Sequence, residues 1–198
     1  PYSENLDRLD GTASEQRAAL QIYTCETVSG LSSLSIPDGS IIELEGYAVK
    51  GDGGGQTLKH IASGRAAKIS EFNAIGRTFI DSGFRFTGAD ESYYDATDLA
   101  TIVPARFGVF PTPIGATEVD CSSRFNAMLE TARSQFDAIT MRGNYKINLP
   151  PGTFIVNSSL IVRSGVHLSG GVGTRIQKGA GWTGDQHCFV FRGGATGY

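Results

Sequence analysis

Four carboxylic acids in one short stretch, Asp90, Glu91, Asp95 and Asp98, are the residues of this sequence best suited to chemistry. Glycoside hydrolysis uses two carboxyl groups roughly 5–9.5 Å apart, one as general acid and the other as base or nucleophile. The segment that carries these acids, residues 90–98, is polar, and we interpret it as a solvated connection between two domains. We therefore predict that these acids are not a catalytic pair.

Elimination chemistry on a polysaccharide needs a base and a Lys or Arg that stabilises an enolate-like intermediate. Arg163 and Arg175 could supply the cation, but the sequence offers no base that we can pair with them. Several aromatic residues could stack on sugar rings, although contacts in the core or between subunits explain them more simply: Phe84, Phe86, Tyr93, Tyr94 and Trp182. We assign no catalytic residue within this chain.

Two glycine-rich stretches, residues 51–59 and residues 170–173, invite comparison with phosphate-binding loops. A P-loop has Lys and then Ser or Thr directly after its last glycine, whereas Gln56 and Thr57 follow the first stretch. The second stretch follows a strand pattern, but no helical pattern comes after it, which argues against dinucleotide binding. We expect the first stretch to be a turn, and we expect no bound cofactor.

Residues that could bind metals are few and scattered. The histidines lack H-x-x-x-H or H-E-x-x-H spacing, and His167, which lies between apolar neighbours, is expected to point outward from a strand. No cysteine lies in a CxxC pair, so we interpret the cysteines as free buried thiols of a protein folded in a reducing cytosol, with a disulfide as the alternative. No metal site is predicted from these residues: His60, His167, His187, Cys25, Cys121 and Cys188.

The composition favours short strands joined by tight turns. Of 198 residues, 26 are glycine and 19% are charged, which excludes a helical bundle or coiled coil. The net charge of −3 argues against a broad nucleic-acid footprint, and no apolar run approaches the ~20 residues that span a bilayer. Residues 1–5 show no secretory signal and no initiator Met, so we expect a fragment or a processed chain.

Three parts follow one another along the chain, at residues 1–22, 23–104 and 105–198. The first part has an amphipathic helical pattern, and we interpret it as an attachment or linker segment whose apolar stripe a partner chain could bury. The residues that carry the pattern are Leu6, Leu9, Ala13, Arg17 and Leu20.

Residues 23–104 are expected to form a small, mainly β domain. A strand over 41–49, a glycine-rich turn and a strand over 57–61 predict a hairpin-like unit. The segments 77–80 and 83–86 are predicted to be further strands.

The last part, residues 105–198, begins with the clearest helix, predicted over 119–136. Its apolar residues fall on one face: Phe125, Met128, Leu129, Ala132 and Phe136. The polar residues Asp120, Ser122 and Ser123 are good N-caps, because their side-chain oxygens accept hydrogen bonds from free backbone N–H groups.

Short apolar runs separated by turn residues follow Asn144. Ile176 lies 22 residues after Phe154, and Phe189 and Phe191 lie 23 residues after Val166 and Leu168. A repeat of that length with about three strands predicts one turn of a right-handed parallel β-helix. No closing element is visible before Tyr198, so we expect most of the β-helix to be missing.

Residues 147–176, which include L-P-P-G-T-F-I-V and S-G-V-H-L-S-G, resemble the opening rungs of the pectate-lyase-like β-helix superfamily. The upstream segment 106–132 resembles that superfamily's F-G-A-x-G-D-G-x-x-D-D-T-x-A-I-x-x-A motif, and this resemblance implies that the helix caps the N-terminal end of the β-helix. The sequence departs from the motif at residues 109–119, where F-P-T-P replaces the Gly-Asp-Gly turn.

Two further segments are similar to phage tail proteins. Residues 44–55 with 75–80 resemble the small β domain that precedes the β-helix in many tailspikes, although an aromatic residue common after its glycine run is absent. Residues 5–9 with 17–20 resemble the N-L-x-D-L-x-x-x-x-x-A-R-x-x-L segment of tail fibres and tailspikes.

These resemblances imply the N-terminal part of a bacteriophage tailspike, assembled in the host cytoplasm and located in the virion tail. The intact protein would be a homotrimer that contacts other tail or baseplate proteins through its N-terminal segment. It would bind and degrade a bacterial surface polysaccharide through residues beyond Tyr198, with no nucleic acid, membrane or cofactor involved. The alternatives are a polysaccharide lyase or glycoside hydrolase with its site in this chain, or a bacterial surface carbohydrate-binding protein.

Overall fold

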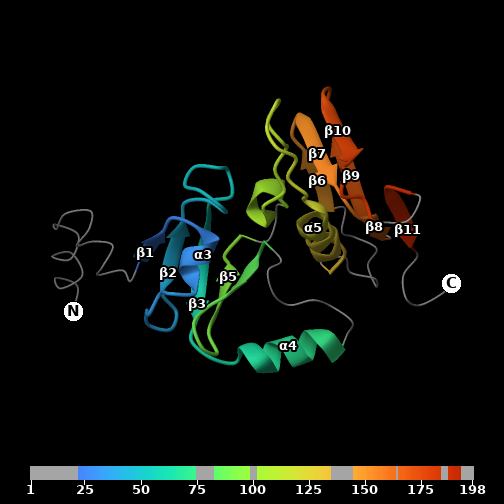
Figure 1. Cartoon of the computed structure of the whole chain (residues 1–198). Coiled ribbons are helices and arrows are strands. Elements are labelled where there is room, and N and C mark those ends of the chain that lie inside the picture. Colours follow the sequence, from blue (N-terminus) through green and yellow to red (C-terminus); the bar gives the residue numbers. More distant parts are fainter. Residues whose placement is uncertain are drawn as a thin grey trace, which may run out of the picture.

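The computed structural model of the chain describes residues 22–74, 83–98, 102–134, 145–163, 165–183 and 187–192. These residues are mainly β, with few helices. A five-stranded sheet and a stack of short parallel strands occupy opposite sides of the chain in Figure 1, with helix α5 beside the stack and helix α4 below the sheet. The first predicted segment lies outside the described residues, apart from Ile22. Within the described part, no helix is long and apolar enough to cross a bilayer.

The five-stranded sheet has the order β1-β2-β3-β5-β4. Its strands are β1 (Ile22–Cys25), β2 (Ile41–Leu44), β3 (Gln56–Ile61), β4 (Arg85–Thr87) and β5 (Tyr93–Ala96), and a short helix α3 (Val28–Leu31) follows β1. Strands β2 and β3 pair antiparallel across the glycine-rich loop, which confirms the predicted hairpin, although β2 ends at Leu44 rather than at residue 49. Burial alternates along both strands, with Ile42, Leu44 and Leu58 in the core.

The interpretation of residues 90–98 as a solvated connection is wrong. Strand β5 lies between β3 and β4, and the buried Tyr94 donates a hydrogen bond to the Leu31 carbonyl at 3.0 Å. Adjacent tyrosines favour a strand, and the only carboxylate within β5, Asp95, is paired with Arg85. These features outweigh the flanking acids on which the sequence interpretation relied.

Helix α4 (Arg65–Ala74) follows β3 and was not predicted. Its residues with described side chains are all half-buried or exposed, so no strongly apolar face marks it in the sequence. The strand predicted at 77–80 lies outside the described residues. The strand predicted at 83–86 is present as β4, shifted toward the C-terminus.

The predicted helix at 119–136 is α5 (Ser122–Ser134). Phe125, Met128, Leu129 and Ala132 are buried, as their spacing predicts, whereas Phe136 lies outside the described residues. Asp120 caps the first turn, because its Oδ1 accepts the Ser122 N–H at 2.9 Å. A short 3₁₀ helix, η1 (Pro104–Phe107), precedes this region.

Six strands follow α5 in two similar groups of three. We call β6 (Tyr145–Leu149), β7 (Gly152–Val156) and β8 (Leu160–Arg163) the first coil. We call β9 (Val166–Gly170), β10 (Thr174–Lys178) and β11 (Phe189–Arg192) the second coil. Each strand of the first coil pairs in parallel with the corresponding strand of the second, so the second coil stacks on the first.

The register of this stack agrees only partly with the predicted repeat. Phe154 lies opposite Ile176, as predicted. The other two predicted pairs are wrong: Phe189 lies opposite Leu160 and Phe191 opposite Val162, each 29 residues apart. A constant repeat fails because the connection from β10 to β11 is longer than the corresponding connection in the first coil.

One buried cluster joins the sheet to the coils. It includes Leu58 and Phe84 from the sheet, Phe107 from η1, Phe125 from α5 and Phe154 from the first coil. The sheet and the coils therefore pack against each other through η1 and α5.

Candidate functional site

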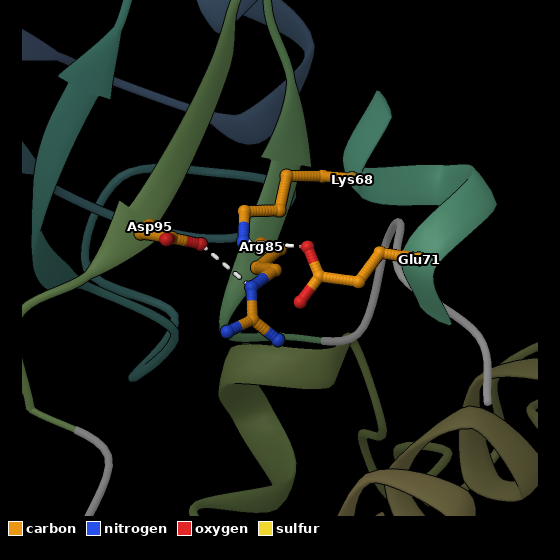
Figure 2. Close-up of polar contacts among 4 residues, drawn as sticks. All are labelled: Lys68, Glu71, Arg85 and Asp95. Carbon is orange, nitrogen blue, oxygen red and sulfur yellow. Dashed lines mark hydrogen bonds and ion pairs between the residues drawn. The ribbon is translucent and has the colours of Figure 1, made fainter. Parts of the chain in front are cut away.

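A cluster of four charged side chains lies where α4 approaches β4 and β5. The Arg85 Nε atom is 2.7 Å from Asp95 Oδ1, and the Lys68 Nζ atom is 2.8 Å from Glu71 Oε2. Figure 2 shows the charged ends of all four side chains turned toward one another. Burial raises the pKa of the Asp95 carboxyl, and the neighbouring Arg85 only partly opposes this effect. The two cations and two anions balance, with one ion pair within α4 and the other between β4 and β5.

The acids nominated from the sequence have separate partners. Glu91 Oε2 accepts the Ala66 N–H at 3.0 Å, at the start of α4, and Asp98 Oδ2 lies 3.6 Å from Arg106 Nη1. Asp90 occupies a turn with a positive φ of 47°. Asp95 belongs to the charged cluster. Glu91, Asp95 and Asp98 thus contact different segments of the chain.

The two nominated arginines also differ in their surroundings. Arg163, on β8, has its Nε atom 3.2 Å from Glu130 Oε2 on α5, whereas Arg175 on β10 is exposed. Sequence reasoning missed Glu130 because its proximity to Arg163 depends on α5 packing beside β8.

Most of the nominated aromatic residues belong to the core. Phe84, Phe86, Tyr93 and Tyr94 are buried in the sheet, as the simpler explanation predicts. Trp182 is half-buried, and the Lys178 Nζ atom lies 4.2 Å from the centre of its ring.

The glycine-rich loop after β2 is a turn, as predicted, and it is organised around the Asp52 carboxylate. Asp52 Oδ1 accepts the N–H groups of Tyr47 at 2.9 Å and Gly54 at 2.8 Å. Its Oδ2 accepts those of Ala48 at 2.7 Å and Val49 at 3.1 Å. Partial burial raises the pKa of Asp52, but the four N–H donors outweigh burial and lower it overall. The charged carboxylate therefore fixes the shape of the loop.

Replacing Asp52 with Asn should lower the free energy of unfolding by about 1–3 kcal/mol at neutral pH, because an amide offers one acceptor oxygen in place of two. The folded-state pKa lies below the ordinary value of 3.8, so this stabilisation is present above that value and is lost as the pH falls through the folded pKa. Urea titrations at several pH values should show a shallower acid loss of stability in the variant. Asp38→Asn is the control, because Asp38 Oδ1 accepts the Ala62 N–H in an exposed loop. An unchanged acid profile in Asp52→Asn would contradict this account.

The histidines and cysteines are placed largely as expected. His167 is exposed on β9, and His60 is buried with its Nδ1 atom 3.0 Å from the Pro37 carbonyl oxygen. The cysteines are free, with Cys25 and Cys121 buried and Cys188 half-buried. Within the described ranges, no group of three or more His, Cys, Asp or Glu side chains is placed to hold a metal ion.

Helix α5 completes the free edge of β8 with one side-chain amide. Asn126 Oδ1 accepts the Ile161 N–H at 2.8 Å, and Asn126 Nδ2 donates to the Ser159 carbonyl at 3.0 Å. These are the bonds that a neighbouring strand would supply, so Asn126 replaces a strand at this edge.

The residues at the start of α5 complete the turn between β7 and β8 in the same way. Ser122 Oγ accepts the N–H groups of Asn157 at 2.7 Å and Ser158 at 3.1 Å. Asp120 Oδ1 also accepts the Asn157 N–H, at 3.0 Å. Asp120 and Ser122, nominated as helix caps, therefore also bind the first coil.

The segment before α5 covers the free edge of β7. The Thr112 N–H donates to the Thr153 carbonyl at 2.7 Å, and the Cys121 N–H donates to the Ile155 carbonyl at 3.0 Å. Strands β7 and β8 of the first coil are therefore bonded on one edge by side chains and loops, and on the other by the second coil.

A cavity of about 350 Å³ lies beside the second coil. Its lining is mainly apolar and comes from both coils: Leu149, Leu168, Ser169, Gly170, Thr174, Ile176 and Phe189. Leu168, Ile176 and Phe189 are only half-buried there, which is the degree of burial expected of core residues that lack one covering layer.

Two solved phage proteins resemble the chain. The enzymatically active domain of tailspike protein 4 of bacteriophage CBA120 has a TM-score of 0.55 and 18% identity, with 88% of this chain and 20% of that chain covered. The enzymatically active domain of tailspike protein 2 of the same phage has a TM-score of 0.54 and 16% identity, with 96% of this chain and 24% of that chain covered.

A third solved protein, WceF of Pantoea stewartii, is described as a glycan biofilm modifying enzyme with a tailspike-like parallel β-helix fold. Its TM-score is 0.54 at 17% identity, with 80% of this chain and 21% of that chain covered. No family model matches the sequence, and no curated protein matches it. The predicted resemblance to phage tailspikes and tailspike-like parallel β-helix proteins is thus confirmed at the level of fold. The chain spans about a fifth to a quarter of the length of these proteins.

Proposed function

We propose that this chain is the N-terminal part of a phage tailspike, which connects the virion tail to a polysaccharide-binding, right-handed parallel β-helix. The observation that carries the proposal is the difference between the two edges of the coil stack. The first coil is completed by Asn126, Ser122 and the segment before α5, whereas Leu168, Ile176 and Phe189 of the second coil are only half-buried and line a cavity. Such a stack begins at α5 and is suited to accept further coils, each of which needs its neighbour to bury its core.

In this proposal the three parts of the chain have different roles. Residues 1–22 attach to other tail or baseplate proteins, residues 23–104 form a small β domain, and residues 105–198 form the capping helix and the first rungs. The assembled protein is a homotrimer in the virion tail and is made in the host cytoplasm. It binds no nucleic acid, membrane or cofactor. The likeness to two tailspikes of bacteriophage CBA120 supports this arrangement.

Polysaccharide cleavage is proposed for the whole protein rather than for this chain. The nominated acids Asp95 and Asp98 contact Arg85 and Arg106, which suits structural ion pairs better than an acid and base facing a substrate. Purified chain mixed with host capsule or O-antigen should therefore release no new reducing ends. Release of oligosaccharides by this chain would place the active site within it.

A second candidate function is that of a cell-encoded glycan-modifying enzyme. The specific observation that favours it is the likeness to WceF, which comes from Pantoea stewartii and is described as modifying glycan biofilm. In that case the same coils would begin a β-helix that acts at the cell envelope, without a virion.

Immunogold electron microscopy separates the two candidates. Antibodies raised against the purified chain would be applied to virions and to uninfected cells from the source of the gene. Gold at the virion tail, abolished by pre-incubation with the purified chain, is the result expected of a tailspike. Gold confined to uninfected cells would overturn the proposal and favour the envelope enzyme.

A further inference from the structure

Tyr47 lies in the loop after β2 and is held firmly by the sheet. Its carbonyl oxygen accepts the N–H of Val28, the first residue of α3, at 3.1 Å. Its own N–H donates to Asp52 Oδ1 at 2.9 Å. The backbone of Tyr47 is therefore fixed on the sheet side of the molecule by the same carboxylate that organises the loop.

The Tyr47 ring makes its contacts on the other side, with the segment that leads into the coils. The Phe110 ring meets it edge-on, with centres 6.4 Å apart and an interplanar angle of 67°. The Arg124 guanidinium carbon, on α5, lies 5.3 Å from the centre of the Tyr47 ring. A cation over an aromatic face is an attractive contact with a defined geometry, so Tyr47 links the sheet directly to α5.

Gly108 lets the ring approach this closely. It has a left-handed φ of 68°, and a β-carbon added there would overlap the Tyr47 ring. Its carbonyl oxygen accepts a hydrogen bond from Arg124 Nη1 at 3.3 Å. Gly108, Tyr47 and Arg124 therefore form one compact contact between the sheet, η1 and α5.

The neighbouring 3₁₀ helix, η1, packs against α5 and β6 as well as against the sheet. Phe107 is buried against Phe84, with ring centres 5.6 Å apart. The buried cluster and the contact between Tyr47 and Arg124 therefore both join the sheet to α5.

We infer that the contact of Tyr47 with Arg124, Phe110 and Gly108 locks the orientation of the five-stranded sheet relative to α5 and the coils. Without this contact, the buried cluster around Phe107 and Phe125 still joins the two halves, but their relative orientation varies over a wider range while each half remains folded. The lock deepens the proposed connecting role, because a connector must transmit the orientation of the tail to the receptor-binding body.

The test is a distance distribution between spin labels on the two halves. Labels are placed at Lys59→Cys on β3 and Arg175→Cys on β10, both at exposed positions, in a Cys188→Ser background. A weaker interface allows more relative motion of the two halves, so we expect the loss of the Tyr47 ring in Tyr47→Ala to broaden the distribution about twofold or more. Tyr23→Ala is the control, because Tyr23 is a half-buried tyrosine on β1.

A second variant tests the same contact without removing the ring. Gly108→Ala places a methyl group against Tyr47 and should broaden the distribution as Tyr47→Ala does. Gly115→Ala is its matched control, because Gly115 has a similar φ of 78° with no atom within 4 Å of the added carbon. In the Tyr47→Ala background, Gly108→Ala should add no further broadening.

Unchanged distributions in both Tyr47→Ala and Gly108→Ala would overturn the inference. If Tyr47→Ala loses its circular-dichroism signal and does not fold, Gly108→Ala and Arg124→Met carry the same expectation. The measurement uses the isolated chain, so its outcome is independent of whether the antibodies label virions.

Discussion

Replacing Phe154 with Ala will lower the free energy of unfolding by about 3–5 kcal/mol, the range for a buried phenylalanine. Phe154 is completely buried on β7 of the first coil. Its ring meets that of Phe125 on α5 edge-on, with centres 6.3 Å apart, and its backbone lies opposite Ile176 of the second coil. Truncating this side chain therefore leaves a cavity between the helix and both coils.

Urea denaturation followed by circular dichroism measures this effect. Thr153→Ala is the matched control, because Thr153 is the preceding residue on the same strand and is half-buried. The control should change stability by under about 1 kcal/mol, as is usual away from the core. A loss under about 1 kcal/mol for Phe154→Ala would mean that α5 and the coils do not share the core described above.

Asn126→Ala should destabilise the chain by about 2–3 kcal/mol, because it leaves the Ile161 N–H and the Ser159 carbonyl without their partner. Alanine is a better helix former than asparagine, so the substitution would stabilise an ordinary exposed helix position. Asn73→Ala on α4, where Asn73 is exposed, supplies that reference. The difference between the stability changes of the two variants gives the contribution of the Asn126 hydrogen bonds at the edge of β8 to the free energy of unfolding.

Hydrogen exchange locates the effect of Asn126→Ala. The Ile161 amide should exchange faster in Asn126→Ala, whereas amides of the five-stranded sheet should change less. Asn126→Asp keeps an acceptor for the Ile161 N–H but loses the donor to Ser159. Its free energy of unfolding should therefore lie between those of the wild type and Asn126→Ala. Equal stability of Asn126→Ala and Asn73→Ala would show that the strand edge does not depend on this amide.

Local patterns in the sequence predicted the elements that depend on their own residues. The spacing of Phe125, Met128, Leu129 and Ala132 gave α5 and its buried face. The β2–β3 hairpin followed from two strand patterns around a glycine-rich turn. The pairing of Phe154 with Ile176 followed from a repeat of apolar runs.

Features that depend on the length of a connection or on distant contacts were not predictable in this way. The predicted register of Phe189 and Phe191 was wrong because the connection before β11 is longer than a constant repeat allows. The acids near β5 hid its strand pattern, because the sequence does not show that the Asp95 carboxylate pairs with Arg85, ten positions earlier. The division of the chain at residues 22 and 104 stays a prediction.

The contacts that define the candidate site left little signal in the sequence. An asparagine in the middle of an amphipathic helix gives no sign that it completes a strand edge 35 residues later. The Gly-Asp-Gly run indicated a turn, but the gathering of four N–H groups on Asp52 depends on how the loop folds back. The role of Gly108 depends on where Tyr47 places its ring.

Cross-linking of paired cysteines tests the stacking of the two coils most directly. Lys146 on β6 and His167 on β9 are exposed and lie directly opposite each other, and paired strands are about 4.8 Å apart. In a Cys188→Ser background, Lys146→Cys with His167→Cys should be joined efficiently by a short thiol cross-linker, as measured by mass spectrometry. Lys146→Cys with Arg175→Cys, whose second cysteine lies on a different sheet of the stack, should not be joined. Cross-linking of the second pair but not the first would contradict the parallel stack on which this account rests.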